Sequence, residues 1–302
     1  MFNFEPDNIL AVMHLLAFMF FLSLNAGPSA HQNGVSLYRQ HKYAEAIAAL
    51  EQAIQSEQSG TPEYRESALM IGQSYYLLSQ APKAIPWLEK IRELNEANYM
   101  LGYAYLQAGQ PAQSEAAFAR LFHLPSDSAG AHLMAGQMML KQEYENQALV
   151  EIHKALALDP KLPQAHYLLG INAIYRGRFD DAESELKQEI AVNPAFAMAW
   201  YRLGDVYARR EQFDRAIPNL ERAVWLNPDY SGPYILLGKC YFKQRNLMNA
   251  EGILRRALAI DPQNTSAKYL LGQTLVAEGK TQEGKALLEQ LQQMQVPSLE
   301  KK

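Results

Sequence analysis

Cysteine is nearly absent from this sequence of 302 residues. The single Cys240 excludes an internal disulfide and any zinc site built on cysteine ligands. A basic excess is also missing, because 28 Lys and Arg residues face 32 Asp and Glu residues, for a formal charge of −4. Nucleic acid is therefore not expected as a partner, since a protein needs a basic surface to displace its counterions.

One apolar segment lies near the start of the chain, at residues 9–24, where only His14 and Ser23 are polar. It is shorter than the ~20 residues that a membrane-spanning helix needs, and its length fits the apolar core of an export signal. Small residues follow it, as a cleavage site requires, but no Lys or Arg precedes it. The sequence predicts a signal peptide over residues 1–26 and an exported protein, periplasmic or secreted. A membrane anchor through residues 9–24 and a buried apolar helix remain alternatives.

A glycine recurs along the chain with a nearly constant interval. The eight positions are Gly34, Gly72, Gly102, Gly136, Gly170, Gly204, Gly238 and Gly272. The last five intervals are 34 residues each, and the first two, 38 and 30, average to the same value. The flanking sequence repeats as well, so the chain is predicted to be an array of about eight similar units.

Each unit has the apolar pattern of two amphipathic helices that share an interface. In the unit around Gly204, the first helix presents Trp200, Leu203, Gly204 and Tyr207 on one face. The second helix presents Ala216, Leu220, Ala223 and Val224. Turn signals separate the helices: Gly109, Gly177 and Gly279 follow first helices, and Pro160, Pro194, Pro228 and Pro262 follow second helices. The glycine is expected to permit close contact between the two helices.

These residues, together with Pro228, resemble the tetratricopeptide repeat from Gly27 to about Ser298. The resemblance implies an all-α fold, a right-handed α-solenoid of about eight helix–turn–helix units over residues 27–298. Residues 1–26 would be the signal peptide or anchor, and residues 299–302 a C-terminal tail. We expect the first helix to begin at Pro28, with Gly27 as its cap. The offsets in the early intervals predict a longer loop near residues 56–62 and a shorter one near residues 91–98.

No pattern in the sequence indicates catalysis, a metal site or a cofactor. A phosphate-binding GxxxxGK[ST] loop is absent, and no Cys–His arrangement supports a nucleophile. His132 and His166 occupy the position of Trp200 in their units, so we expect them to be packed at the helix interface rather than to bind a metal. Cys240 is expected to be a buried, inert thiol. Glu189 departs from the repeat, which mostly has alanine at its position.

The remaining candidate for function is the face of each first helix that points away from the core, here called the stripe. The resemblance implies that it lines the concave groove of the superhelix. Its predicted binding residues are Tyr99, Tyr103, Lys141, Tyr167, Tyr175, Tyr201, Arg202, Asp205, Arg209, Lys239, Phe242 and Lys243. Aromatic rings and cations of this kind suit an extended partner polypeptide that contains acidic residues.

The sequence thus predicts a non-catalytic scaffold that binds a protein or peptide partner in its groove, with an exported or envelope-associated location. Two alternatives remain open. In the first, the chain is a membrane-tethered accessory subunit of an assembly or secretion complex. In the second, it is a regulatory or substrate-recruiting subunit of a separately encoded enzyme.

Overall fold

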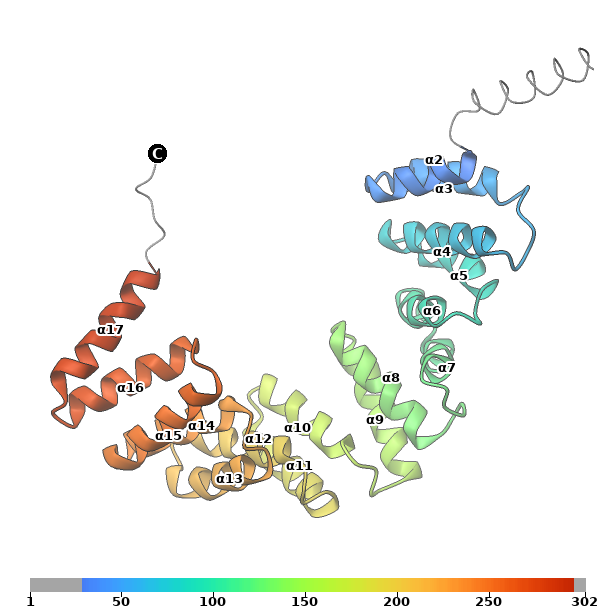
Figure 1. The fold of residues 1–302 in the computed structure, drawn as a ribbon. Coiled ribbons are helices and arrows are strands. Elements are labelled where there is room, and N and C mark those ends of the chain that lie inside the picture. Colours follow the sequence, from blue (N-terminus) through green and yellow to red (C-terminus); the bar gives the residue numbers. More distant parts are fainter. Residues whose placement is uncertain (1–28, 296–302) are drawn as a thin grey trace, which may run out of the picture. The chain divides into compact units, whose positions relative to one another are not determined.

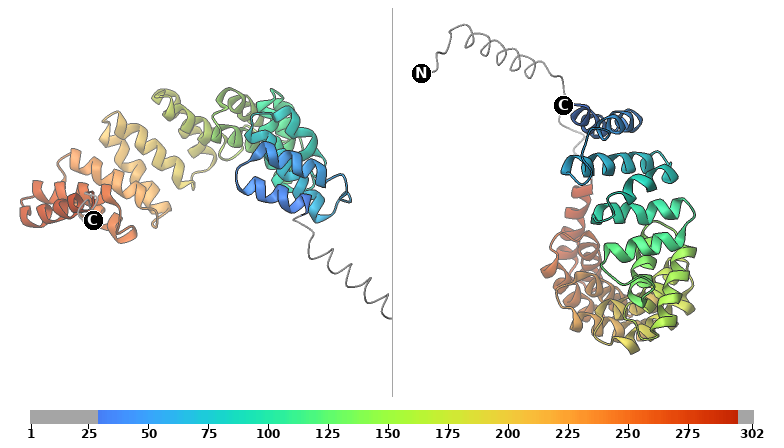
Figure 2. Two further views of the ribbon diagram at one scale, coloured as in Figure 1. Left: turned by 90° about the horizontal axis from the view of Figure 1, so that it is seen from above. Right: turned by 90° about the vertical axis from the view of Figure 1, so that its right-hand side faces the viewer.

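The structure, a computed structural model, describes residues 29–295, which form sixteen helices and no strands (Figure 1). The helices follow one another as pairs joined by short turns. The chain divides into two compact units, Met1–Glu151 and Ile152–Lys302, and the boundary falls inside α9. Within each unit the pairs stack in chain order, as both views of Figure 2 show. The all-α solenoid class predicted from the repeat is confirmed.

Each unit contains four helix pairs when α9, which the boundary divides, is counted with its partner α8. The helices of the N-terminal unit are α2 (Ala30–Arg39), α3 (Tyr43–Ala53), α4 (Pro62–Leu77), α5 (Ala81–Glu89), α6 (Asn95–Gln107), α7 (Pro111–Leu121), α8 (Ala129–Lys141) and α9 (Glu145–Leu158). Those of the C-terminal unit are α10 (Ala165–Tyr175), α11 (Phe179–Val192), α12 (Ala197–Arg209), α13 (Phe213–Leu226), α14 (Ser231–Lys243), α15 (Leu247–Ile260), α16 (Thr265–Ala277) and α17 (Thr281–Gln295).

The predicted turn signals act as expected. Gly109, Gly177 and Gly279 follow first helices with φ values of 72°, 70° and 90°, a left-handed conformation that glycine adopts without steric cost. In the C-terminal unit α11, α13 and α15 each end two residues before a proline. Proline disfavours helical geometry at the residue before it, which explains these ends.

The expected start of the first helix is wrong. The helix begins at Ala30, and Ser29 is its cap; residues 27 and 28 lie outside the described part of the chain. The Ser29 hydroxyl accepts a hydrogen bond from the backbone N–H of Gln32 (3.2 Å), and the Gln32 side chain accepts one from the Ser29 backbone N–H (3.2 Å). This reciprocal box satisfies two free helix donors, which glycine cannot do because it has no side chain.

The early changes in repeat length are accommodated differently at their two sites. The connection between α3 and α4, residues 54–61, is long, as expected. The second change shortens a helix instead of a loop: α5 has only nine residues, against 14 in α13. Ile91, in the turn after α5, is buried in the core of the N-terminal unit, where it packs with Ile71 and Ala97.

The recurring glycine does bring the two helices of a pair together. A Cβ atom added at Gly204 would lie 2.7 Å from Cγ and Cδ2 of Leu220, which is fully buried. The same glycine–leucine contact, sixteen residues apart, recurs at Gly34, Gly72, Gly170, Gly238 and Gly272, and Gly102 meets Phe118 instead. Since real Cβ atoms do not approach so closely, only glycine fits at this crossing without a shift.

A hydrogen bond between a tyrosine and a glutamate ties successive pairs together. The tyrosine stands three residues after the repeat glycine, and the glutamate is on the second helix of the preceding helix pair. The bonds are Tyr75–Glu51 (2.9 Å), Tyr105–Glu89 (2.9 Å), Tyr207–Glu183 (2.9 Å) and Tyr241–Glu221 (2.7 Å). Burial and the bond to the carboxylate raise the pKa of Tyr105 and that of Tyr241 to about 12.

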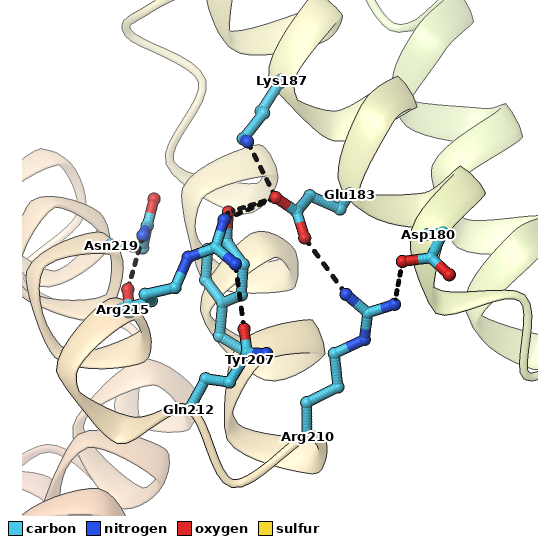
Figure 3. A network of polar contacts seen from close by, with 8 residues as sticks. All are labelled: Asp180, Glu183, Lys187, Tyr207, Arg210, Gln212, Arg215 and Asn219. Carbon is cyan, nitrogen blue, oxygen red and sulfur yellow. Dashed lines mark hydrogen bonds and ion pairs between the residues drawn. The ribbon is translucent and has the colours of Figure 1, made fainter.

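Figure 3 shows how this junction expands around Glu183 of α11. The Glu183 carboxylate accepts hydrogen bonds from Lys187 (2.8 Å), Tyr207 (2.9 Å), Arg215 (2.6 Å) and Arg210 (3.2 Å). Burial raises the pKa of Glu183, but the hydrogen bonds from Lys187, Tyr207 and Arg215 outweigh burial and hold that pKa at about 2. Three of the four donors come from α12, α13 and the turn between them, so the network joins two successive pairs.

Glu189, the departure from alanine, has a structural role at the start of α10. Its carboxylate is fully buried and accepts hydrogen bonds from the backbone N–H groups of Gln164 (2.8 Å) and Tyr167 (3.2 Å). Gln164 precedes the helix with φ 73° and makes no side-chain cap of its own. A residue from the neighbouring helix therefore caps α10, and the negative charge also complements the helix dipole.

Candidate partner-binding surface

The twelve predicted stripe residues are divided between the two units. Tyr99, Tyr103 and Lys141 belong to the N-terminal unit, and the other nine belong to the C-terminal unit. Tyr99 is 41% exposed, whereas Tyr103 is 3% exposed, and its hydroxyl donates to the backbone oxygen of Met138 (3.3 Å). Tyr103 is therefore a core residue of the N-terminal unit, and Tyr99 and Lys141 are the predicted stripe residues that are exposed there.

In the C-terminal unit four predicted residues gather around one pocket between the first helices α10 and α12. Its volume is about 330 Å³. The lining residues are Ile171, Ile174 and Tyr175 from α10 and Arg202, Asp205 and Arg209 from α12. The Tyr175 side chain is 82% exposed at this pocket. The pocket thus has an apolar wall and a charged wall.

The charged wall holds two arginines with different partners. Arg209 donates through Nε to Asp205 Oδ1 (3.0 Å), four residues earlier on the same helix. Arg202 lies over the Tyr201 ring, 5.0 Å from the ring centroid. Burial lowers the pKa of Arg202, but the nearby Tyr167 and Tyr201 hydroxyls and Asp205 outweigh burial and raise that pKa. The Nε atom of Arg202 is buried and has no hydrogen-bond partner among the described residues.

The other predicted residues of the C-terminal unit surround this pocket or extend the stripe. Tyr167 and Tyr201 are half-buried and pack edge-on against Phe196 (4.9 Å between ring centroids) and Tyr230 (5.8 Å). Both rings therefore serve mainly to pack the helices beside the pocket, and only part of each is exposed to a partner. On α14, which contacts α12, the cations Lys239 and Lys243 are exposed and Phe242 is half-buried. The stripe therefore continues from α12 to α14 with the same positive charge.

Two residues of the pocket, Ile171 and Ile174, are missing from the predicted binding set. They stand one and four residues after Gly170, at stripe positions, and the repeat register alone is enough to find them. The predicted set contains only aromatic and charged side chains, and so it leaves them out. Their effect is to give the pocket an apolar wall opposite the two arginines.

The residues considered for metal binding or catalysis are packed in the core or paired. His132 is buried, and its Nδ1 lies 2.6 Å from Glu151 Oε2; His166 is half-buried, and its Nδ1 lies 2.7 Å from Glu185 Oε2. Cys240 is fully buried, and burial raises the pKa of its thiol to about 11. The expectations of packed histidines and a buried thiol are confirmed. Within residues 29–295, no group of three His, Cys, Asp or Glu side chains is arranged to hold a metal ion.

The sequence matches the tetratricopeptide repeat family over residues 31–98, 99–163, 167–231 and 204–265, and a second tetratricopeptide profile matches residues 243–297. The chain belongs to the tetratricopeptide repeat family. Tetratricopeptide repeat proteins are generally non-catalytic scaffolds that bind protein or peptide partners. No curated protein sequence matches the chain.

Several solved tetratricopeptide structures are similar to this protein. MamA 41-end from Desulfovibrio magneticus RS-1 is 22% identical, with a TM-score of 0.51 over 55% of this chain and 93% of that one. YrrB, described as having an unusual peptide-binding site, is 22% identical, with a TM-score of 0.52 over 59% and 92%. PilF of Pseudomonas aeruginosa is 19% identical, with a TM-score of 0.54 over 67% and 91%. Identities this low support the fold alone.

The apolar segment at residues 9–24 and the predicted signal peptide lie outside the described residues. Of the helices between residues 29 and 295, none has the length and apolar character needed to cross a membrane.

Proposed function

We propose that this tetratricopeptide protein is a non-catalytic scaffold that binds an acidic segment of a partner polypeptide on the stripe of its C-terminal unit. One observation carries the proposal, namely the charge of that surface. The cations are Arg202, Arg209, Lys239 and Lys243, and Asp205 is the only acidic residue among the predicted stripe residues of this unit. The whole chain has a formal charge of −4, so this face differs in sign from the molecule that carries it.

The positions of these cations favour recognition of an extended segment. Arg209, Lys239 and Lys243 are exposed on the neighbouring helices α12 and α14, and no ion pair except Arg209–Asp205 occupies them among the described residues. Exposed charges of one sign steer an oppositely charged partner and orient it on the surface. The exposed Tyr175 ring adds a residue type that often contributes much of the binding energy at protein interfaces.

The test is a double charge reversal, R209E/K243E, compared with a single reversal on the second-helix side, R256E. Arg256 is exposed on α15 and lies outside the stripe. Proteins cross-linked to each form in envelope and soluble fractions are quantified by mass spectrometry. We expect a partner that the wild type and R256E retain and that R209E/K243E loses by more than about tenfold, which corresponds to about 1.4 kcal/mol.

Far-ultraviolet circular dichroism controls for folding, because both changes are on the surface and should leave the helical signal intact. Capture of the same proteins in the same amounts by all three forms would remove the stripe as the binding face. A loss that R256E shares would show that total charge, and not this face, governs capture.

We also propose that the scaffold acts outside the cytoplasm, after removal of residues 1–26. The support is the apolar run at residues 9–24 with the small residues after it. Intact-mass measurement of the mature protein tests this step: an N-terminus at Gly27 is the expected result, and a full-length chain from the native source would contradict it.

A further inference from the structure

We propose that the pocket between α10 and α12 is a subsite for a single carboxylate, that of a glutamate side chain in the partner. This inference deepens the proposed function and depends on it, because it names the residue class that the stripe selects. It is carried by the pocket itself, where two guanidinium groups and one buried aspartate face two isoleucines.

The pocket offers hydrogen-bond donors that the described chain does not use. A guanidinium group has five N–H donors in a planar fork that matches a carboxylate. Of the Arg209 donors one is used, toward Asp205, and the terminal N–H groups of that guanidinium remain available. Hydrogen bonds between a guanidinium group and a carboxylate are charge-assisted, so a carboxylate bound here gains more than a neutral group of the same shape.

The charge of the pocket favours a group with one negative charge. Arg202 and Arg209 are both cationic and Asp205 is anionic, which leaves one positive charge to neutralise. Asp205 is buried on the same wall, so a group with one negative charge neutralises the pocket, whereas a dianion such as a phosphate would leave an excess negative charge beside the Asp205 carboxylate. A carboxylate therefore matches this wall better than a phosphorylated residue does.

The opposite wall favours an aliphatic stem on that carboxylate. Ile171 and Ile174 line it, and the Tyr175 ring stands exposed beside them. The volume of about 330 Å³ is at the lower end of ligand pockets, which suits one side chain better than a larger ligand. The two methylene groups of glutamate can lie on the isoleucines while its carboxylate reaches the arginines, and aspartate has one methylene fewer.

The direct test is a titration of the full chain followed by the NMR signals of the Nε–H groups of Arg202 and Arg209. The probe is N-acetyl-glutamate N-methylamide, and its glutamine analogue is the uncharged control. We expect the glutamate probe to shift both signals and to bind at least about tenfold more tightly than the glutamine analogue. Equal binding of the two probes would overturn the proposal. N-acetyl-leucine presents a main-chain carboxylate, and tighter binding of this probe would overturn the assignment to a side chain.

Substitutions in the pocket should change the affinity for the glutamate probe in opposite directions. R202Q and R209Q each remove a cation and should weaken the glutamate probe by about tenfold. D205N removes the competing negative charge and should strengthen it, a gain that mere damage to the fold would not produce. R256Q, on the second-helix side, should leave the affinity unchanged. Failure of D205N to improve binding, together with unchanged binding by R202Q and R209Q, would contradict the subsite.

Partner capture separates this inference from the proposed function. If K239E/K243E abolishes capture while R202Q and R209Q leave it unchanged, the stripe binds the partner but the pocket does not select it. If none of these variants changes capture, the proposed function fails as well.

Discussion

The close crossing at Gly204 makes a prediction about stability that has a matched control in the same unit. Gly204 lies in the middle of α12, and a methyl group there would meet the buried Leu220 at 2.7 Å. Gly252 lies inside α15, and a methyl group added there would have nothing within 4 Å. Both glycines carry the same intrinsic cost in a helix, so alanine at the two positions differs only in what it contacts.

The size of the effect follows from two opposing terms. Replacing a helical glycine by alanine stabilises by about 1 kcal/mol through helix propensity. An extra methyl group in a packed core costs about 1–3 kcal/mol. We therefore expect G252A to stabilise the protein by about 1 kcal/mol and G204A to destabilise it by about 0–2 kcal/mol. The difference between the two variants, about 1–3 kcal/mol, isolates the packing term because the propensity term cancels.

Urea unfolding followed by far-ultraviolet circular dichroism measures both variants. Repeat arrays do not always unfold in one step, so the comparison requires transitions of equal slope. A third variant, L220A, completes a double-mutant cycle. G204A made in the L220A background should stabilise the protein, because the Leu220 Cγ and Cδ2 atoms that the new methyl group would meet are absent. Equal stabilities of G204A and G252A, or no change of sign in the L220A background, would refute the packing argument.

Three further predictions concern the polar junctions of the C-terminal unit. Since the pKa of Glu183 falls from about 4.5 to about 2 on folding, its contribution is complete above about pH 4.5 and is lost as the pH falls toward 2; E183Q should flatten the pH dependence of the urea midpoint over that range. E189A should destabilise by about 1–2 kcal/mol and speed hydrogen exchange at Gln164 and Tyr167, whereas a more stable variant would mean that burying the carboxylate costs more than the cap returns. Y207F should cost about 1 kcal/mol by calorimetry, and no loss would remove the tyrosine–glutamate bond as a stabilising contact.

Much of the fold follows from a period of 34 residues, because the period sets the contacts that every unit must make. The repeat glycine and its leucine, Gly204 and Leu220 in one repeat, are sixteen residues apart in every repeat that keeps both residue types. The close helix pair is therefore predictable from the sequence alone. The cap at Ser29 is not. Its signal, a serine three residues before a glutamine, is local, and it is weaker than that of the Gly27–Pro28 pair beside it.

The polar junctions are predictable only in part. Tyr207 is placed correctly on the core face by the helical period, but its hydroxyl bond to Glu183 depends on which residue the preceding second helix offers. That glutamate stands at one of two positions a helical turn apart, as Glu183 and Glu221 show relative to their own glycines. The helical period places both positions on one face, and only the packing of successive pairs decides which one the tyrosine reaches.

The position after each repeat glycine carries a different residue from one repeat to the next. In the C-terminal unit it carries Ile171, Asp205, Lys239 and Gln273, while the glycine before it never changes. The glycine is held by the second helix of its own pair, and so the fold constrains it. The next residue stands about 100° further around the first helix, away from this glycine–leucine crossing. Function is therefore expected where the period leaves residues free, and two of these four residues line the one pocket that we assign to a partner carboxylate.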